Sequence, residues 1–416
     1  MPIPREDDPR EDVPPALPVE PVRPGRAVPT PSAGRLQRGG VPLGAPFGVP
    51  VRISVLGVLV AVLLAGSTLG TQARDAGSSD DTVLVLGLLG GLLLEASVLA
   101  HEIAHCVAAR LLGLRVGGLR LWALGGLTEV EAERRSPLRE YVVAVVGPLT
   151  SVLTAGICGV LALHVGGTDD RPVGMLLFWL ATVNALLAAF NLLPGLPLDG
   201  GRVLRAVVWR LSGSDTTGTR AAAVTGFVVA GVTVLAGLLV PGANGTAFLA
   251  FFVAAYVAVN AQAALRSAGV AERTPGLSAG RLARRALTAP SDLPLGEALR
   301  RAGTVGATAL VVTSSDGRAR SLVSGARVDA TPADRRPWVS VGELANPITE
   351  GLVLDARLVG QAVLDALREH PASEYLVVEP AGAVLGVLAT VDVVASIDPR
   401  QAARAARTAA PAGWTR

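Results

Sequence analysis

The stretch His101-Glu102-Ile103-Ala104-His105 lies inside a long apolar run from Thr82 to Ala109. On a helix, this H-E-x-x-H spacing puts two imidazoles at i and i+4 on one face, where both can bind one zinc ion. The glutamate beside them can accept a proton from metal-bound water. Ionisable groups in a membrane span cost about 2.5–3.5 kcal/mol each and usually carry function. We therefore expect a metal site within a membrane helix, in preference to a purely structural cluster.

The composition is that of a membrane protein. Half of the 416 residues are hydrophobic, 17% are charged and 4% are aromatic, and the mean hydropathy is +0.49. The formal net charge of +3 is too small to indicate binding to nucleic acid. Cys106 and Cys158 both lie in apolar segments, so we expect buried packing of these side chains and no disulfide framework.

Six apolar segments are each long enough to cross a bilayer core of about 30 Å. They span residues 52–71, 82–109, 141–164, 173–194, 219–240 and 246–264. Arginine is concentrated in the connections after the second and fourth segments. By the positive-inside rule, both termini and the end of the second segment that carries the histidines face the cytoplasm. We therefore expect a polytopic α-helical protein of the cell membrane with about six transmembrane helices.

Composition divides the chain into four regions. We expect a disordered tail rich in Pro and Arg at 1–45, a membrane core at 46–266, a cytoplasmic α/β domain at 285–397 and a second tail at 398–416. Within the α/β domain, Leu295–Val328 and Leu358–Val393 repeat one pattern of a short helix, a strand, a glycine turn and a second strand. Each repeat is too small to be stable alone, so the two should pack as a pair.

A short segment between the second and third apolar segments has the pattern of a strand. Leu119 to Glu131 alternates apolar and polar residues around a central Gly125-Gly126. This favours a β-hairpin or strand at the membrane surface, with a plain connecting loop as the alternative.

A catalytic zinc needs a third protein ligand and an open position for water. The candidates in or beside the apolar segments are Glu95, His164, Asp199, Asn184 and Asn191. His164 lies at the far end of the third segment, and Glu95 lies about 10 Å along the helix from Glu102, which makes direct ligation by either implausible. The role of Glu95 is left open.

Asp199 is the strongest candidate for the third ligand. It follows a run interrupted by Pro194 and Pro197 at the cytoplasmic end of the fourth segment, the same side as the histidines. Irregular backbone at membrane depth is tolerated where it lines a cavity. Gly200-Gly201 would let the chain turn tightly beside the carboxylate. A helix-capping or turn role is the alternative for this Asp-Gly pair.

Three motifs together resemble the site-2 protease family of intramembrane zinc metalloproteases. They are H-E-x-x-H in the second segment, G-P-L-T-S at Gly147–Ser151, and N-L-L-P-x-x-P-L-D-G-G-R at Asn191–Arg202. This resemblance covers residues 50–265 approximately. The repeats at 285–397 resemble a pair of CBS domains, an arrangement of one bacterial branch of that family, which implies a bacterial source.

The resemblance implies a role for each matching residue. His101, His105 and Asp199 would bind one Zn²⁺ per subunit, and Glu102 would activate the water. For substrate binding it implies Asn191, with Asn184, Gly125 and Gly126 in further roles. The strand at Gly125-Gly126 could take up a scissile segment by β-augmentation, because a peptide bond within a helix is shielded.

The function implied is regulated intramembrane proteolysis, the cleavage of transmembrane segments of membrane-tethered proteins. The partner would be a single-span membrane protein such as an anti-sigma factor or another tethered regulator, which nothing in the sequence identifies. A catalytically silent relative is the first alternative, and the intact set of four site residues argues against it. A metal transporter with regulatory domains is the second. It would need further ligands along a transmembrane path, where only Glu95 and His164 remain.

The CBS-like repeats depart from the pattern of nucleotide-binding members. The second repeat has Asp392 but places Ala389 three residues before it, with Thr390 displaced by one. The first repeat keeps Ser324 but has Arg327 where the aspartate belongs. These departures argue against adenine-nucleotide binding, which stays an alternative through Asp392. They favour a role in homodimerisation or substrate gating, and the oligomeric state is left open.

Overall fold

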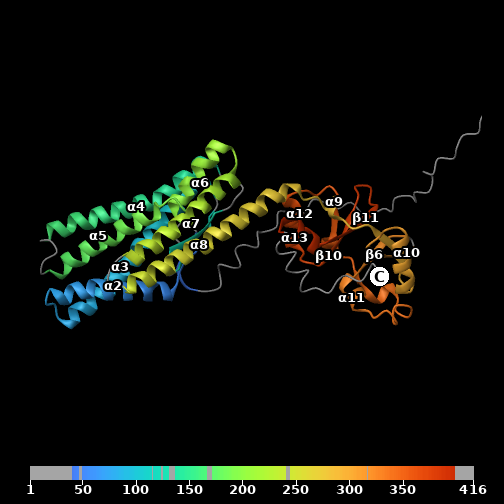
Figure 1. The fold of residues 1–416 in the computed structure, drawn as a ribbon, viewed down its shortest axis with the longest axis horizontal. Helices are drawn as coiled ribbons and strands as arrows, with labels where there is room; N and C mark the ends of the chain where they lie inside the picture. The colour runs from blue at the N-terminus through green and yellow to red at the C-terminus, as the bar shows by residue number, and fades with distance from the viewer. Residues whose placement is uncertain are drawn as a thin grey trace, which may run out of the picture. The chain divides into compact units, whose positions relative to one another are not determined.

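The computed structural model describes residues 40–45, 49–114, 116–122, 125–130, 136–165, 171–239, 244–315 and 317–398 (Figure 1). The chain forms two compact units, whose boundary along the sequence falls between Ala268 and Gly269, and each is described by itself. This boundary lies two residues after the expected end of the membrane core. The two predicted tails lie outside the described residues except for 40–45 and Asp398.

Five described helices of the first unit are long and apolar enough to cross a membrane, which confirms a helical membrane core. They are α2 (Val55–Asp75), α3 (Asp80–Leu111), α4 (Pro137–His164), α5 (Pro172–Asn191) and α7 (Asp215–Leu239). The sixth predicted segment lies in α8 (Asn244–Arg273), a helix of 30 residues. That α8 crosses the bilayer stays a prediction.

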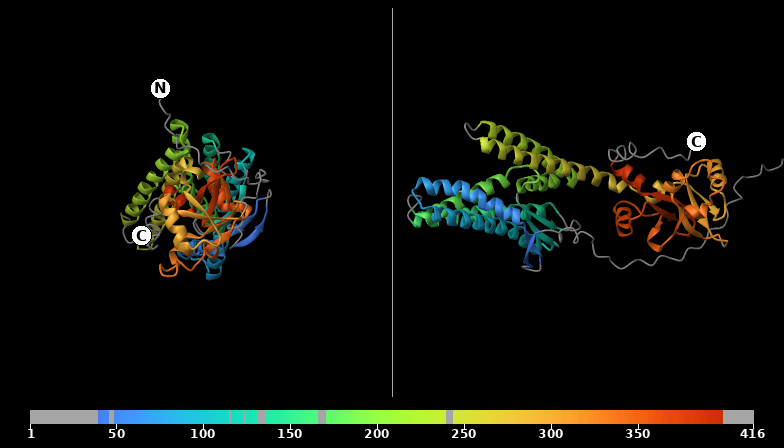
Figure 2. Two further views of the ribbon diagram at one scale, coloured as in Figure 1. Left: turned by 90° about the vertical axis from the view of Figure 1, so that its right-hand side faces the viewer. Right: turned by 90° about the horizontal axis from the view of Figure 1, so that it is seen from below.

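Small residues allow the membrane helices to approach closely, and α2 and α3 run side by side (Figures 1 and 2). A Cβ added at Gly91 of α3 would lie 2.5 Å from the Cα of Val62 in α2. Ala65 and Leu69 of α2 are fully buried at the same interface. Close backbone contact supplies dispersion energy where lipid removes the hydrophobic driving force between helices.

The fourth predicted segment ends as a helix at Asn191, where the Pro- and Gly-containing loop begins. The loop leads into the amphipathic helix α6 (Asp199–Ser212). The backbone of this loop is held to α7 (Asp215–Leu239) by a hydrogen bond of 2.9 Å from Leu196 N to Ala222 O. Gly226 of α7 permits this contact, since an added Cβ would lie 2.5 Å from Leu196 O.

A four-stranded sheet in the order β1-β2-β3-β4 also belongs to the first unit. Its strands are β1 (Val41–Gly44), β2 (Val51–Ile53), β3 (Val116–Trp122) and β4 (Gly125–Val130). The predicted hairpin is therefore present, but it begins at Val116, and Gly125-Gly126 opens its second strand instead of forming its centre. Strand β1 lies within the expected tail at 1–45 and pairs with β2, which follows that segment. Val51 and Leu119 of the sheet pack against Cys106 of α3.

The second unit contains the two predicted repeats. The first comprises β5 (Ala286–Pro290), α10 (Leu295–Thr304), β6 (Ala309–Thr313), β7 (Ala319–Val323) and α11 (Gly325–Ala330), and the second β9 (Val353–Asp355), α12 (Gln361–Glu369), β10 (Glu374–Val378), β11 (Val384–Ala389) and α13 (Thr390–Ile397). This unit also contains α9 (Ala279–Leu282) and β8 (Ala345–Pro347). Two sheets, β5-β6-β7-β8 and β11-β10-β9, meet through a shared apolar cluster that includes Val311 and Leu376. The repeats therefore pack as a pair.

Candidate metal centre

Helix α3 presents His101, Glu102 and His105 to the interior of the membrane unit. The two histidines are 3% exposed and the glutamate 9% exposed. The imidazole rings lie one turn apart with their centroids 4.9 Å from each other and their planes at 78°. The i, i+4 spacing therefore brings both rings to one point, as the sequence predicts.

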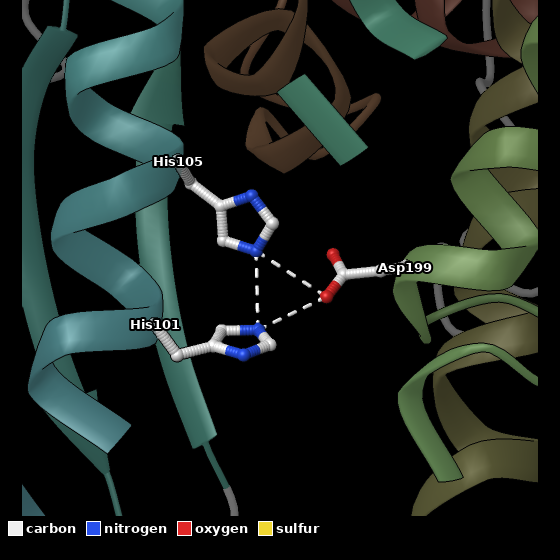
Figure 3. A group of neighbouring side chains, drawn as sticks. All are labelled: His101, His105 and Asp199. Carbon is white, nitrogen blue, oxygen red and sulfur yellow. Dashed lines mark hydrogen bonds and ion pairs between the residues drawn. The ribbon is translucent and has the colours of Figure 1, made fainter. Parts of the chain in front are cut away.

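The carboxylate of Asp199 joins this pair from α6, about a hundred residues later in the chain (Figure 3). Its Oδ2 lies 3.1 Å from His101 Nε2 and 3.3 Å from His105 Nε2. The two Nε2 atoms are 3.2 Å apart. Three donor atoms thus form a nearly equilateral triangle, and all three side chains are buried.

Helix α4 orients both imidazoles through their Nδ1 atoms, which face away from the triangle. His105 Nδ1 donates a hydrogen bond of 2.6 Å to the carbonyl oxygen of Val143, and His101 Nδ1 lies 2.9 Å from Ser151 Oγ. A carbonyl can only accept, so the proton of a neutral His105 is on Nδ1 and the lone pair of Nε2 points into the triangle. This arrangement, with the outer nitrogen bonded to protein, is usual for histidines that bind metals.

The triangle matches the requirements of zinc. Tetrahedral bonds of ~2.0–2.1 Å place neighbouring ligand atoms about 3.4 Å apart. The observed edges of 3.1 to 3.3 Å fall just short of that spacing. Two imidazole lone pairs and a carboxylate oxygen meeting at one buried point would repel one another without a cation. The residues present therefore fit a zinc ion with three protein ligands.

Gly147 of α4 leaves the space that both imidazoles occupy. A Cβ added there would lie 2.2 Å from His105 Nε2 and 2.6 Å from His101 Nε2. Gly147 and Ser151 belong to the G-P-L-T-S motif, which contributed to the family resemblance without any role for these residues. The sequence did not reveal these roles, because they depend on how α4 packs against α3.

The glycines after Asp199 serve a purpose other than the expected turn. Gly200 and Gly201 lie in the first turn of α6. A Cβ at Gly200 would lie 2.2 Å from Leu192 O, and one at Gly201 would lie 2.3 Å from the carbonyl carbon of Gly195. Glycine is thus required because the preceding loop folds back onto the first turn of α6. This close contact holds Asp199 beside the two histidines.

A cavity of about 160 Å³ opens beside the triangle. Its polar lining comes from His101, Glu102, Asn191, Asp199 and Tyr256. Glu102 and Asn191 therefore face the same space as two of the three candidate ligands. Tyr256 of α8 was not found by sequence reasoning, since nothing in its local pattern marks it.

The other predicted residues lie elsewhere. The side chain of Asn184 is fully buried in α5 and donates to Ser97 Oγ of α3 at 3.2 Å and to Leu180 O at 2.9 Å. Asn184 is not part of the cavity lining. Gly125-Gly126 lies in β4 at an edge of the sheet, and β4 packs against α3. Glu95 is buried on α3 outside the triangle, as expected.

In the second unit, the residues of the modified nucleotide motif are engaged with protein. Arg284 donates to both oxygens of Asp392, with Nε–Oδ2 at 2.6 Å and Nη2–Oδ1 at 2.8 Å. Thr390 Oγ1 donates to Ala372 O at 2.7 Å. Both polar groups are therefore engaged with protein, Asp392 with Arg284 and Thr390 with the carbonyl oxygen of Ala372.

Comparison with known proteins agrees with this site. The sequence model of peptidase family M50 matches residues 90–169 and 159–236, which contain both histidines and Asp199. The chain is 35% identical to the putative zinc metalloprotease Rip3 of Mycobacterium tuberculosis over 388 residues, covering 87% of this chain and 93% of that protein. The chain belongs to peptidase family M50. It is therefore a zinc metallopeptidase of the site-2 protease family, and zinc is its cofactor.

The chain is also similar to a further curated protein and to two solved structures. The putative zinc metalloprotease sll0528 of Synechocystis is 28% identical, covering 87% of this chain and 96% of that protein. The solved site-2 protease of Methanocaldococcus jannaschii is 24% identical and covers 54% of this chain and 94% of its own, with a TM-score of 0.40. A CBS domain of a bacterial CNNM/CorC magnesium transporter covers 38% of this chain and 96% of its own at 13% identity, with a TM-score of 0.26.

Proposed function

We propose that this M50 peptidase cleaves peptide bonds within the membrane at a zinc ion bound by His101, His105 and Asp199, with Glu102 as the general base. The observation that carries the proposal is the triangle of three buried donor atoms with edges of 3.1 to 3.3 Å. Glu102 lines the cavity beside that triangle, where a water molecule and a peptide bond would meet.

The chemistry divides between the metal and the chain. When bound, zinc polarises the scissile carbonyl and lowers the pKa of water toward ~7. Glu102 accepts the proton as the water oxygen attacks the carbonyl carbon, and it then gives that proton to the departing amine nitrogen. Val98, Leu187 and Phe190 contribute apolar side chains to the lining of the same cavity.

Two features support a mode of substrate binding. Asn191 lines the cavity at the end of α5, so its amide can hold the carbonyl or amide group of a bound segment. Strand β4, which contains Gly125 and Gly126, lies at a sheet edge, and a scissile segment added there would be extended. For Asn184, the hydrogen bond to Ser97 supports an indirect role in holding α5 against α3.

We further propose how the chain is oriented in the membrane and which role each of its two parts has. The distribution of arginine supports a multi-pass topology with both termini in the cytoplasm, which places the start of α6 and the zinc site near that face. The substrate would be a single-span membrane protein, such as an anti-sigma factor or another tethered regulator. The membrane core at 46–266 would carry the chemistry, and the CBS-like pair at 285–397 would regulate it, with homodimerisation as one means.

Metal analysis and a cleavage assay on purified full-length protein test the assignments. His101→Ala, His105→Ala and Asp199→Ala should each lose the single zinc per chain. Glu102→Gln should keep zinc but lose cleavage of a transmembrane substrate by ~10²–10⁴-fold, because an amide cannot accept the proton. Full zinc in Asp199→Ala would assign the third ligand elsewhere. Comparable cleavage by Glu102→Gln would remove that residue as the base.

The same assay addresses the alternative of a silent relative. Zinc retained by the wild type without cleavage of any membrane-protein substrate would favour it. Membrane proteins that co-purify with Glu102→Gln, and not with His101→Ala, would provide the substrates to test.

A further inference from the structure

Arg202 lies between the third zinc ligand and a buried carboxylate of another helix. Its Nη1 is 3.5 Å from Asp199 Oδ1, one turn earlier in α6. Its Nε donates to Glu140 Oε1 of α4 at 3.1 Å. The side chain of Glu140 is only 6% exposed. The guanidinium therefore bridges the carboxylate that faces the histidines and a carboxylate fixed on α4.

The two oxygens of Asp199 have different partners. Oδ2 faces both imidazoles, whereas Oδ1 faces Arg202. The terminal torsion of an aspartate is broad, so a carboxylate held at one oxygen alone can rotate or tilt. Contact with Arg202 opposes that motion and keeps a single oxygen directed at the metal position.

The bridge is itself held by its surroundings. Arg205, one turn further along α6, lies 4.0 Å from the same Glu140 oxygen and donates to Asp215 Oδ1 with 2.9 and 2.6 Å bonds. Charges thus alternate in the order Asp199, Arg202, Glu140, Arg205, Asp215. Because a buried charge without a partner is strongly unfavourable, Glu140 and the arginines fix one another in place.

Glu140 belongs to a stripe along α4 that contacts both histidines directly and Asp199 through Arg202. Glu140, Val143, Gly147 and Ser151 are spaced by three, four and four residues, so they lie on one face of the helix. Ser151 contacts His101, Val143 contacts His105, and Gly147 leaves the space for both rings. Through Arg202, Glu140 extends the same control to Asp199.

We propose that the Glu140–Arg202 ion pair is a positioning device for the zinc site, which locks the carboxylate of Asp199 so that α4 sets the placement of all three ligands. This inference rests on the proposed zinc ligands. Residues that orient metal ligands from outside typically change metal affinity by ~10–100-fold when they are removed.

The test measures zinc affinity by chelator competition and the visible absorption spectrum of the Co²⁺-substituted protein, both on the full-length chain. Arg202→Gln should weaken zinc binding by ~10–100-fold and change the cobalt spectrum. Arg202→Lys keeps the charge but cannot bridge both carboxylates with a planar fork, so it should restore affinity only in part. Arg210→Gln is the matched control, since Arg210 is exposed near the end of the same helix, and it should match the wild type.

Two further variants separate positioning from folding. Glu140→Gln leaves Arg202 with one carboxylate fewer, while Glu140→Gln with Arg202→Gln leaves no unpaired charge, so the double variant should fold and still bind zinc weakly. Wild-type zinc affinity and cobalt spectrum in Arg202→Gln, or in the double variant, would overturn the positioning role. If His101→Ala also bound zinc normally, the ligand assignment itself would be wrong. If His101→Ala loses zinc while the Arg202 variants bind it like the wild type, the ligand assignment stands. Only the positioning role of the Glu140–Arg202 ion pair is then rejected.

Discussion

Replacing Gly147 by alanine should remove zinc from the enzyme without unfolding it. The new Cβ would lie 2.2 Å from His105 Nε2, whereas ordinary contact begins at 3.4 Å. One ring, or α4 itself, must therefore move by ~1 Å. Zinc–ligand distances tolerate only about ±0.2 Å. A ring displaced by that amount no longer ligates, and we expect zinc affinity to fall by at least ~100-fold, or ~2.8 kcal/mol at ~1.4 kcal/mol per tenfold.

The assay is chelator competition for zinc on purified protein, with the helical circular dichroism signal as a check of folding. Gly156→Ala is the matched control, because it lies on the same helix and its added Cβ would have no neighbour within 4 Å. Both substitutions gain the same helix propensity, so the difference between them isolates the contact with the imidazoles. Wild-type zinc affinity in Gly147→Ala would show that α4 does not form the back wall of the site.

Three further predictions concern the topology and the second unit. Labelling of single cysteines should place Asp80 outside and Arg110 in the cytoplasm, and finding both on one side would break the predicted topology. Truncation after Arg273 should leave a zinc-loaded membrane core with altered cleavage rate, oligomeric state or substrate choice, whereas loss of zinc would make the second unit part of the site. Titration of the full-length protein with ATP, ADP or AMP should give weak heat or none, because Arg284 occupies both oxygens of Asp392. Micromolar affinity that disappears in Asp392→Ala would contradict this.

The features that depend on neighbours along the chain could be predicted from the amino-acid sequence. The meeting of His101 and His105 follows from 3.6 residues per turn, so a motif of five residues is enough to predict it. The membrane helices follow from hydropathy, and the repeats follow from self-similarity. Asp199 could be predicted as the third zinc ligand on two grounds. The segment interrupted by Pro194 and Pro197 ends on the same side of the membrane as the histidines, and the family motif contains this aspartate.

The contacts that hold the zinc ligands in place depend on packing between helices. Val143, Gly147 and Ser151 gain their roles because α4 packs against α3, and no local pattern encodes that contact. Strands β1 and β2 could not be predicted, because four- and three-residue strands carry almost no periodic signal. Their stability comes from pairing, β1 with β2 and β2 with β3. The division of Asp199 between the histidines and Arg202 depends on how three helices meet. Distances along a helix are fixed by covalent geometry, whereas distances between helices are fixed by the packing of the whole unit.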